Sequence, residues 1–380
     1  MRSTSSQLIA SWLIALVAAA TLLAATGYRT RDPDSRAYIA ITTQLVQEPV
    51  DRWIAPQWWG AWAGQGRFLE HPAGTFVPPA LLARTGYPVA QSLFVVTLAC
   101  QIVSVLVLVA LASRFLPAAH ARAMGWALLL LPIAFVFRIR ANQEYLVLAG
   151  IVISLYGLER ARASAVWVVV ATMGCLFALA VKGVFALAAP VAGALWLWAR
   201  RPNPVSAWMA LGVVTAAIPL AAWAYEIAYA RVTGESFLAY YLGARMSLEA
   251  GVSSTLPFPL DKFWNVLWYV GRVGWYSAPW SLALLMLLRP GARGRMSASA
   301  GRFTTFAMLA AFAAILLVAA RDMRADRYIF PAYFFAASGG VATVCALMPG
   351  MSALADRLDR LWPWGPAVLW LALVAGRVVL

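Results

Sequence analysis

The chain of 380 residues has little charge and almost no cysteine or histidine. Charged residues make up 12% of it, and it has three cysteines and two histidines. The cysteines lie inside apolar runs without metal-ligand spacing, so they indicate neither a disulfide framework nor a zinc site. Gly-rich phosphate loops, the Gly-x-Ser-x-Gly elbow and the His-Glu-x-x-His motif are also missing. The sequence therefore does not support the enzyme classes that these motifs mark.

Apolar sequence is abundant, with 63% hydrophobic residues and a mean hydropathy of +0.75. Apolar runs near ~20 residues match the thickness of a bilayer, and lipid accommodates only helices or closed barrels. We therefore predict an all-α polytopic membrane protein, one integral-membrane domain over residues 1–380, with about eleven transmembrane helices. The predicted spans are 8–26, 89–112, 123–137, 145–158, 164–181, 183–199, 206–225, 268–288, 304–320, 328–347 and 365–380.

The first apolar run, residues 8–26, has two interpretations. The small residues Ala24-Ala25-Thr26 near its end would suit the cleavage site of a signal peptide. The run is also long enough to span the membrane, and many spans follow it, so we predict a retained helix. Under either interpretation, residues 27–87 leave the cytoplasm.

Basic residues outnumber acidic ones by 30 to 15. With no basic soluble domain present, this excess predicts membrane lipids or a phosphorylated substrate as partners, and no nucleic acid. With the N-terminus inside, every predicted cytoplasmic connection is short and basic, as the positive-inside rule expects. All acidic residues lie on the predicted outer side except Glu159, Asp356 and Asp359. Mixed charge on one face indicates a polar active site there.

The longest polar segment is residues 27–87, which we predict to be the first extracytoplasmic loop and the catalytic one. It carries five of the fifteen acidic residues. Tyr38, Ile41 and Leu45 recur within it at helical spacing, which predicts an interfacial helix over 35–47 that lies on the bilayer.

Four tryptophans follow that helix, Trp53, Trp58, Trp59 and Trp62. They are typical of anchoring at the headgroup level, and their flat apolar faces also suit a wall on which a sugar stacks. A second extracytoplasmic loop is predicted over 226–267, with a flexible, turn-rich connection near its end.

Asp34 is the carboxylate that the first loop places best for chemistry. Asp34 and Tyr38 are four residues apart, so on a helix that begins here they face the same way. A carboxylate there could accept the proton of a hydroxyl acceptor at the interface. Aspartate is also a good N-cap, and its position alone favours a structural role for Asp34 at the start of the 35–47 helix. Asp32, before Pro33, is interpreted as shaping a turn.

Glu70 and His71 precede a Pro-rich return to the membrane. Histidine donates to phosphate, binds metals or exchanges protons near neutral pH. Two adjacent residues do not establish a metal site, so no cofactor is predicted with certainty. An optional divalent ion at Glu70 and His71 stays open beside the interpretation as a solvated pair.

Arginines cluster at two further outer junctions. Arginine suits bidentate capture of phosphate, and it equally suits salt-bridge networks at a membrane surface. The two clusters are Arg138 and Arg140 with Glu144, and Arg321, Arg324 and Arg327 with Asp326.

The order of these pieces resembles that of the polyprenyl-phosphate-sugar-dependent glycosyltransferases of the GT-C fold, closest to the branch of lipid A aminoarabinose transferases and protein O-mannosyltransferases. The resemblance covers residues 8–335, and Ser35, Ala73-Gly74 and Glu144 depart from the usual pattern. The matching motifs are Asp34-Ser35-Arg36-Ala37-Tyr38, Glu70-His71-Pro72-Ala73-Gly74, Glu144 at the opening of a span, Lys182-Gly183, Pro279-Trp280 and Arg327-Tyr328-Ile329-Phe330-Pro331.

The resemblance implies an enzyme of the bacterial inner membrane whose active site faces the periplasm or cell exterior. It implies transfer of a hexosyl or pentosyl group, with inversion, from a polyprenyl-phosphate-linked donor to a hydroxyl-bearing lipid, glycan or protein acceptor. Asp34 would be the catalytic base. The substrate-binding residues would be Tyr38, Glu70, His71, Arg138, Glu144, Lys182, Arg327 and Tyr328.

A glycolipid flippase or transporter is the alternative. Such a protein should bury ionisable groups near the membrane midplane and often has two repeated halves. This sequence places its charges at span ends, with Lys182 and Arg272 as exceptions that depend on the exact span boundaries, and it has no second copy of residues 32–79. The sequence therefore favours the enzyme.

Overall fold

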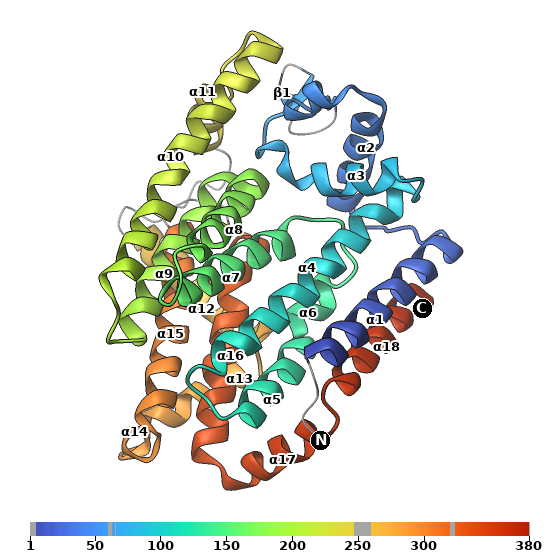
Figure 1. Cartoon of the computed structure of the whole chain (residues 1–380). Coiled ribbons are helices and arrows are strands. Elements are labelled where there is room, and N and C mark those ends of the chain that lie inside the picture. The colour runs from blue at the N-terminus through green and yellow to red at the C-terminus, as the bar shows by residue number, and fades with distance from the viewer. Residues whose placement is uncertain (1–4, 60–62, 65, 247–259, 320–323, 380) are drawn as a thin grey trace.

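The computed structural model describes residues 5–59, 63–64, 66–246, 260–319 and 324–379 (Figure 1). Helices dominate the described chain. They are α1 (Ser5–Thr26), α2 (Pro33–Gln47), α3 (Val77–Arg84), α4 (Val89–Ala112), α5 (Ala118–Leu129), α6 (Pro132–Phe137), α7 (Glu144–Ala161), α8 (Trp167–Lys182), α9 (Ala188–Ala199), α10 (Val205–Thr233), α11 (Phe237–Tyr240), α12 (Leu260–Tyr276), α13 (Trp280–Ala283), α14 (Ala292–Arg295), α15 (Ala298–Ala319), α16 (Phe330–Leu347), α17 (Pro349–Arg360) and α18 (Trp364–Val379).

Short elements connect these helices. A two-stranded antiparallel ribbon pairs β1 (Ala63–Gly64) with β2 (Arg67–Phe68). The 3₁₀ turns that matter for the site are η2 (Ala73–Thr75), η3 (Gly183–Leu187) and η6 (Asp326–Ile329). The prediction of an all-α multi-pass membrane protein is confirmed.

Among the described residues, six helical stretches are long and apolar enough to cross a membrane, or seven if the bent pair of α17 and α18 counts as one span. About eleven spans were predicted from the sequence. The difference comes from segments that are divided or short. Residues 123–137 break into α5 and α6 before Pro132, and residues 268–288 are divided among the end of α12, α13 and a 3₁₀ turn.

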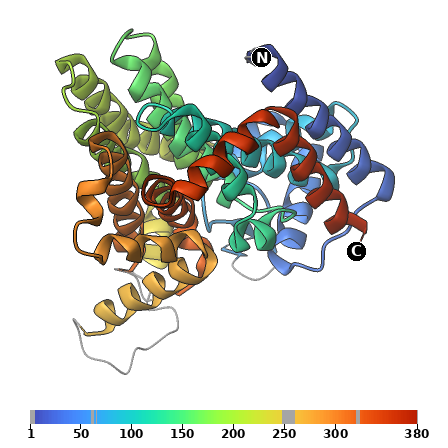
Figure 2. The ribbon, with the colours of Figure 1, turned by 90° about the horizontal axis from the view of Figure 1, so that it is seen from below.

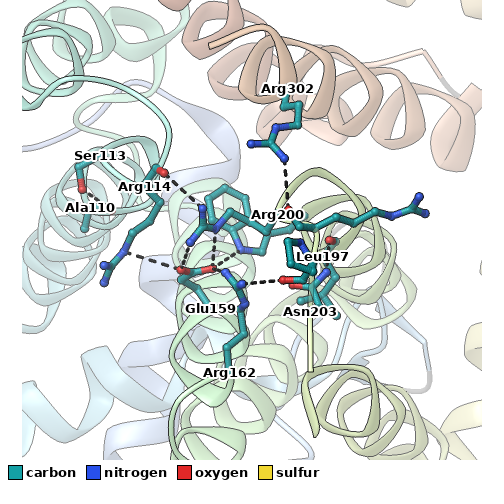
Figure 3. Close-up of polar contacts among 12 residues, drawn as sticks. Ala110, Ser113, Arg114, Glu159, Arg162, Leu197, Arg200, Asn203 and Arg302 are labelled. Atoms are coloured by element: carbon teal, nitrogen blue, oxygen red, sulfur yellow. Dashed lines mark hydrogen bonds and ion pairs between the residues drawn. The ribbon is translucent and has the colours of Figure 1, made fainter. Parts of the chain in front are cut away.

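The helices form a bundle whose two ends differ in their polar contacts. At one end, which we call the basic end, Glu159 of α7 contacts Arg114, Arg162 and Arg200 (Figure 3). At the other, the site end, Lys182 contacts Glu144. The short connections predicted to be cytoplasmic supply the arginines of the basic end, whereas the first loop lies at the site end. The side of the membrane that each end faces stays a prediction.

Within residues 167–199 the chain reverses its direction at Gly183. This position lies between the two spans predicted over 164–181 and 183–199. Lys182, where α8 ends, bonds Glu144 at the start of α7, and Arg200, just after α9, bonds Glu159 near the end of α7. The continuous helical stretch is therefore a hairpin with its turn at the site end. Gly183 makes the turn with φ +60°, a conformation that glycine adopts at little cost.

Close helix packing holds the centre of the bundle together. A Cβ atom on Gly157 of α7 would lie 2.4 Å from the Ala171 nitrogen of α8, so only glycine permits this approach. The α16 helix is buried along nearly its whole length, and Phe330 of α16 meets the ring of Tyr145 edge-on at 4.8 Å. The start of α16, which carries site residues, is therefore fixed by the core.

Helices α1 and α18 run side by side at the margin of the bundle in both views (Figures 1 and 2). Trp12 and Trp370 join them with an edge-to-face contact of 6.0 Å. Their far ends reach the site end, where Arg377 lies near Tyr28. The first and last helices thus bring residues 26–33 and 377–379 together.

The first loop contains the predicted interfacial helix as α2. Ser35, Tyr38, Ile41, Thr42 and Leu45 form its buried face, so the predicted stripe is confirmed. The alternative role of Asp34 as its N-cap is wrong. Asp32 is the N-cap, because its Oδ2 accepts a hydrogen bond from the Ser35 backbone N–H at 2.9 Å and from the Ser35 hydroxyl at 2.6 Å.

The second predicted loop, 226–267, begins and ends in helices. Residue 233 still belongs to α10, and residues 260–267 belong to α12. Between them, Phe237 and Tyr241 pack with Tyr229 in a small aromatic cluster. The turn-rich stretch at 253–259, predicted to be flexible, lies outside the described residues.

Of the four tryptophans after α2, Trp53 is buried under the Arg84 guanidinium, which lies 4.6 Å from its ring centroid. Trp59 is 74% exposed. Trp62 lies outside the described residues. Of the buried Trp53 and the exposed Trp59, only the latter presents a free face, on which a headgroup or a sugar could lie.

Candidate functional site

Asp34 and Arg327 form an ion pair at the centre of the site end. Asp34 lies in the first turn of α2, and Arg327 lies in η6 just before α16. Because Asp32 caps the helix, the Asp34 carboxylate is not used by the α2 backbone. Burial raises the pKa of Asp34 above the ordinary value for an aspartate, and attraction by Arg327 offsets only part of that shift. The Asp34 carboxylate therefore has a raised affinity for a proton, and it does not cap the helix.

A second, deeper pair lies beside the first. Lys182 Nζ donates to Glu144 Oε1 at 2.9 Å and to the Arg327 carbonyl oxygen at 3.3 Å. The side chains are 3% and 1% exposed, so the two charges compensate each other away from water. Glu144 Oε2 is buried and has no hydrogen-bond partner among the described residues. One acceptor oxygen is thus left for a ligand.

Two aromatic rings flank the Lys182 ammonium group. Phe185 and Tyr328 are stacked, with centroids 5.5 Å apart and an interplanar angle of 11°. Lys182 Nζ lies 5.2 Å from the first centroid and 5.3 Å from the second, within the range of cation–π attraction. The rings and Glu144 hold the cation in one place, which is what a preorganised anion site requires.

An apolar cavity of about 210 Å³ opens against these groups. Its polar residues are Glu144, Lys182 and Arg327, which gather in one part of its wall. The remaining lining is supplied by α7, η3, α9, α15, η6 and α16 and is aliphatic or aromatic: Val147, Val184, Phe185, Leu187, Ala188, Ala314, Leu317, Val318, Tyr328, Phe330 and Pro331. A ligand that fits this cavity has an apolar chain and an anionic end.

Tyr38 connects Asp34 to the second half of the loop. Its ring packs edge-on between Phe68 and Phe76, at 6.0 and 5.3 Å. Burial raises the pKa of Tyr38, and the nearby Glu144 raises it further, so the hydroxyl stays protonated. The four-residue spacing from Asp34 places Tyr38 on the buried side of α2, as predicted. It is a hydrogen-bond donor held by aromatic packing.

Glu70 and His71 are both buried, at 8% exposure each, rather than solvated at the interface. The His71 ring lies 6.4 Å from that of Phe68, in the aromatic group around Tyr38. Within the described parts of the chain, no group of three or more His, Cys, Asp or Glu side chains is placed to hold a metal ion. Glu70 and His71 thus offer two ligands at most, and we assign no chemical step to a metal.

The turn after His71 is attached directly to α8. A Cβ atom on Gly74 would lie 2.5 Å from the Ala180 carbonyl oxygen, and the Thr75 hydroxyl donates to the Val181 carbonyl oxygen at 3.1 Å. The departure from the family pattern at Ala73-Gly74 therefore has a structural use, because only glycine allows η2 to approach the end of α8. This attachment fixes the loop relative to Lys182.

Arg138 is not among the cavity residues. Its guanidinium is buried, donates to the Leu129 carbonyl oxygen at 2.6 Å and lies 4.9 Å from the Phe135 ring centroid. The structure thus brings Asp34, Glu144, Lys182, Arg327 and Tyr328 together and places Arg138 elsewhere in its loop.

The overall fold is shared with a protein of known structure. The chain matches the crystal structure of ArnT from Cupriavidus metallidurans in the apo state with a TM-score of 0.65, and the same protein bound to undecaprenyl phosphate with 0.66, at 14% identity in both cases. The chain has the ArnT fold. The GT-C-like fold predicted from the motif order is thereby confirmed.

The match covers 94% of this chain and 62–63% of the ArnT chains, so this chain spans less than two thirds of their length. No protein-family model matches the sequence, and no curated protein matches it.

The sequence did not reveal which aromatic and aliphatic residues line the cavity. It also did not reveal which residues attach the first loop to the helix bundle. Phe185, which flanks Lys182, appears in the sequence as one more aromatic residue in an apolar run. The Tyr225 hydroxyl of α10 accepts from the Ala73 N–H at 3.2 Å and donates to the Ile54 carbonyl oxygen at 2.8 Å, which joins two parts of the first loop. The only sequence signal for Tyr225 is a polar aromatic residue near the end of a span.

Proposed function

We propose that this protein is a membrane glycosyltransferase. It transfers a sugar from a polyprenyl-phosphate carrier to a hydroxyl group of a lipid, glycan or protein acceptor, on the extracytoplasmic side of the bacterial inner membrane. The observation that carries the proposal is the apolar cavity with Lys182 and Arg327 in its wall, and with Asp34 paired to that same arginine.

The cavity suits the donor. A prenyl chain is apolar and would occupy the space between η3 and α16, while the phosphate meets Lys182 and Arg327. These cations are fixed in place before the reaction, so they stabilise the negative charge that grows on the leaving phosphate. The fold similarity to an ArnT structure bound to undecaprenyl phosphate supports a donor of this class.

Asp34 is the proposed general base. When the donor phosphate binds Arg327, the ion pair opens and the Asp34 carboxylate becomes available. It accepts the proton of the acceptor hydroxyl as that oxygen bonds to the anomeric carbon. The bond between that carbon and the phosphate oxygen breaks, and the lipid phosphate leaves with the electron pair. A single displacement of this kind inverts the anomeric centre.

Glu144 and Tyr38 complete the proposed substrate contacts. Glu144 lines the cavity, and its unpartnered Oε2 would accept a hydrogen bond from a hydroxyl or amino group of the sugar. Tyr38 keeps its proton, since burial raises its pKa, and is a donor rather than a second base.

The position of the buried charges supports an enzyme over a transporter. Glu144 begins α7 and Lys182 ends α8, so this pair lies at the site end of the bundle. The other buried carboxylate on α7, Glu159, lies at the basic end (Figure 3). A carrier that moves a headgroup across the bilayer is expected to have ionisable groups near the midplane.

The proposal is tested with purified protein in lipid nanodiscs. Undecaprenyl-phosphate-linked pentose, hexose and aminosugar donors are supplied in turn, and release of undecaprenyl phosphate is measured by mass spectrometry. We expect release from at least one donor by the parental protein and loss of that release in Asp34→Asn. Protein that moves these lipids between the leaflets of a liposome without releasing lipid phosphate would establish the transporter instead.

A further inference from the structure

A second cavity, outside the proposed catalytic centre, lies where α1 ends, α2 begins and α18 ends. It measures about 820 Å³ and its wall is largely polar. Four arginines and one carboxylate supply its charge: Arg29, Arg31, Arg140 and Arg377, with Asp32. The wall therefore carries three more positive than negative charges.

Among the described residues, a carboxylate compensates the charge of only one of the four arginines. Arg140 NH1 lies 3.5 Å from Asp32 Oδ1. Arg29, Arg31 and Arg377 are exposed, and no carboxylate of the described residues lies within ion-pair distance of them. Three cations that converge on one cavity without counter-charges repel one another, so a ligand with negative charge would stabilise this arrangement.

The remaining arginine is held in the wall by the structure itself. The Arg140 guanidinium lies 4.9 Å from the Phe137 ring centroid, and the next residue, Ala141, donates its N–H to the Ser35 hydroxyl at 3.0 Å. Asp32, its partner, is also the N-cap of α2. This side of the cavity is thus rigid and continuous with the helix that carries Asp34.

The opposite side of the cavity meets a lipid-facing surface. Val379 lines the cavity and is 73% exposed, and farther from the cavity, toward the start of α1, Ile9, Leu13, Ile14 and Val17 are all more than half exposed. Exposed apolar side chains on a membrane-spanning helix face acyl chains. A lipid whose chains lie along α1 and α18 would have its headgroup at the arginines.

We propose that this cavity binds the phosphomonoester or diphosphate headgroup of a membrane lipid, separately from the Lys182–Arg327 site. Phosphate oxygens accept the paired N–H groups of arginine, and a headgroup with two negative charges matches the surplus positive charge of the wall. This binding does not depend on glycosyl transfer.

The test measures binding by native mass spectrometry, with the purified chain released from nanodiscs that contain either phosphatidic acid or phosphatidylglycerol at matched total charge. The parental protein should retain phosphatidic acid preferentially. Arg31→Gln combined with Arg377→Gln should weaken that retention at least about tenfold, since each arginine near an anionic headgroup contributes roughly fivefold. Arg31→Lys combined with Arg377→Lys should keep most of it.

Two controls locate the effect. Arg36→Gln removes an exposed arginine of α2 that does not line the cavity, and it should leave retention unchanged. Lys182→Met combined with Glu144→Gln removes the other phosphate site, and in that background the Arg31 and Arg377 substitutions should weaken retention by the same factor. Equal retention of both lipids, or no loss in the Arg31 and Arg377 double variant, would overturn the proposal.

Inorganic pyrophosphate is the soluble probe. Full displacement of phosphatidic acid by pyrophosphate at an equal concentration would show that the acyl chains contribute nothing to binding, and would overturn the assignment to a lipid. Retention of phosphatidic acid in the presence of pyrophosphate would support a lipid-specific site, because the acyl chains then contribute to binding.

Discussion

Asp34 of α2 and Arg327 of η6 form an ion pair across 293 positions of sequence. It joins the first loop to the start of α16, and it places a carboxylate beside a cation of the apolar cavity. In the resting state each group neutralises the other. In the proposed mechanism a donor phosphate competes for the arginine, so donor binding itself would release the base.

We expect Asp34→Asn to abolish most transfer without unfolding the protein. Asparagine cannot act as an effective base, and a lost general base typically costs ~10² to 10⁴ in rate. Because Asp32 is the N-cap of α2, the helix start is unaffected. Donor turnover and the thermal unfolding midpoint are measured together. The matched control is Asp32→Asn, which keeps the cap, since asparagine and aspartate cap equally well. Near-parental turnover by Asp34→Asn would remove this residue from the mechanism.

The pH dependence of turnover reports the ionisation of Asp34. Burial raises its pKa above the ordinary value of about 3.9. The base must be ionised, so kcat/KM should fall as pH decreases through that raised pKa, at a higher pH than for an ordinary aspartate. Removing the attraction of Arg327 favours the protonated form, so Arg327→Gln should move the midpoint further upward. A downward shift in Arg327→Gln would contradict this account of the pair.

The Lys182–Glu144 pair allows stability and function to be separated. Lys182→Met leaves Glu144 buried without its partner, and breaking a buried pair from one side costs about 3–5 kcal/mol. Adding Glu144→Gln removes the orphaned charge and should restore most of the thermal stability. Binding of undecaprenyl phosphate should stay weak in both variants, because the cation is missing. If the double variant regains both stability and lipid binding, Lys182 is structural only.

The sequence predicted a helix well where all the residues on one of its faces share the same environment. The stripe of Tyr38, Ile41 and Leu45 identified α2 because its inward face is uniformly apolar. Span limits failed where helices bend or break, as in residues 268–288, because hydropathy averages over the break. The sequence alone also could not distinguish Asp32 from Asp34 as the N-cap, because the two aspartates on either side of Pro33 have the same capping chemistry.

The sequence predicted charged residues for the site, but it did not predict which of them contact one another. Glu144, Lys182 and Arg327 stood out as charges next to apolar spans, yet their contacts join segments 38 and 145 positions apart. Arg138 had the same signature and lies outside the cavity. The difference is decided by how α6 and α16 pack, which a single sequence does not express.

Gly74→Ala tests the attachment of the first loop to α8. The added Cβ would lie 2.5 Å from the Ala180 carbonyl oxygen, a backbone atom that cannot turn aside. The loop should shift away from Lys182, so turnover should fall by about tenfold or more, in line with the sensitivity of catalysis to ~1 Å displacements. Gly212→Ala in α10, where no atom lies within 4 Å, should leave turnover unchanged. Parental turnover in Gly74→Ala would show that this contact does not position the site.

The basic end offers a test in which stability changes and chemistry does not. Glu159 is 7% exposed and accepts hydrogen bonds from Arg162, Arg200 and the Trp196 ring N–H (Figure 3).

Glu159→Gln removes the negative charge that offsets these arginines, and hydrogen bonds to charged groups contribute ~1.5–3 kcal/mol each in favourable settings. We expect a lower unfolding midpoint and unchanged KM for the donor, since the cavity lies at the other end of α7. Asp359→Asn at the same end breaks a pair with Arg122 in which both side chains are partly exposed, at 32% and 33%, and this should cost less than ~1 kcal/mol. If the two variants destabilise the protein equally, Glu159 does not hold the ends of α4, α7 and α9 together, and the buried cluster contributes no more than a surface ion pair.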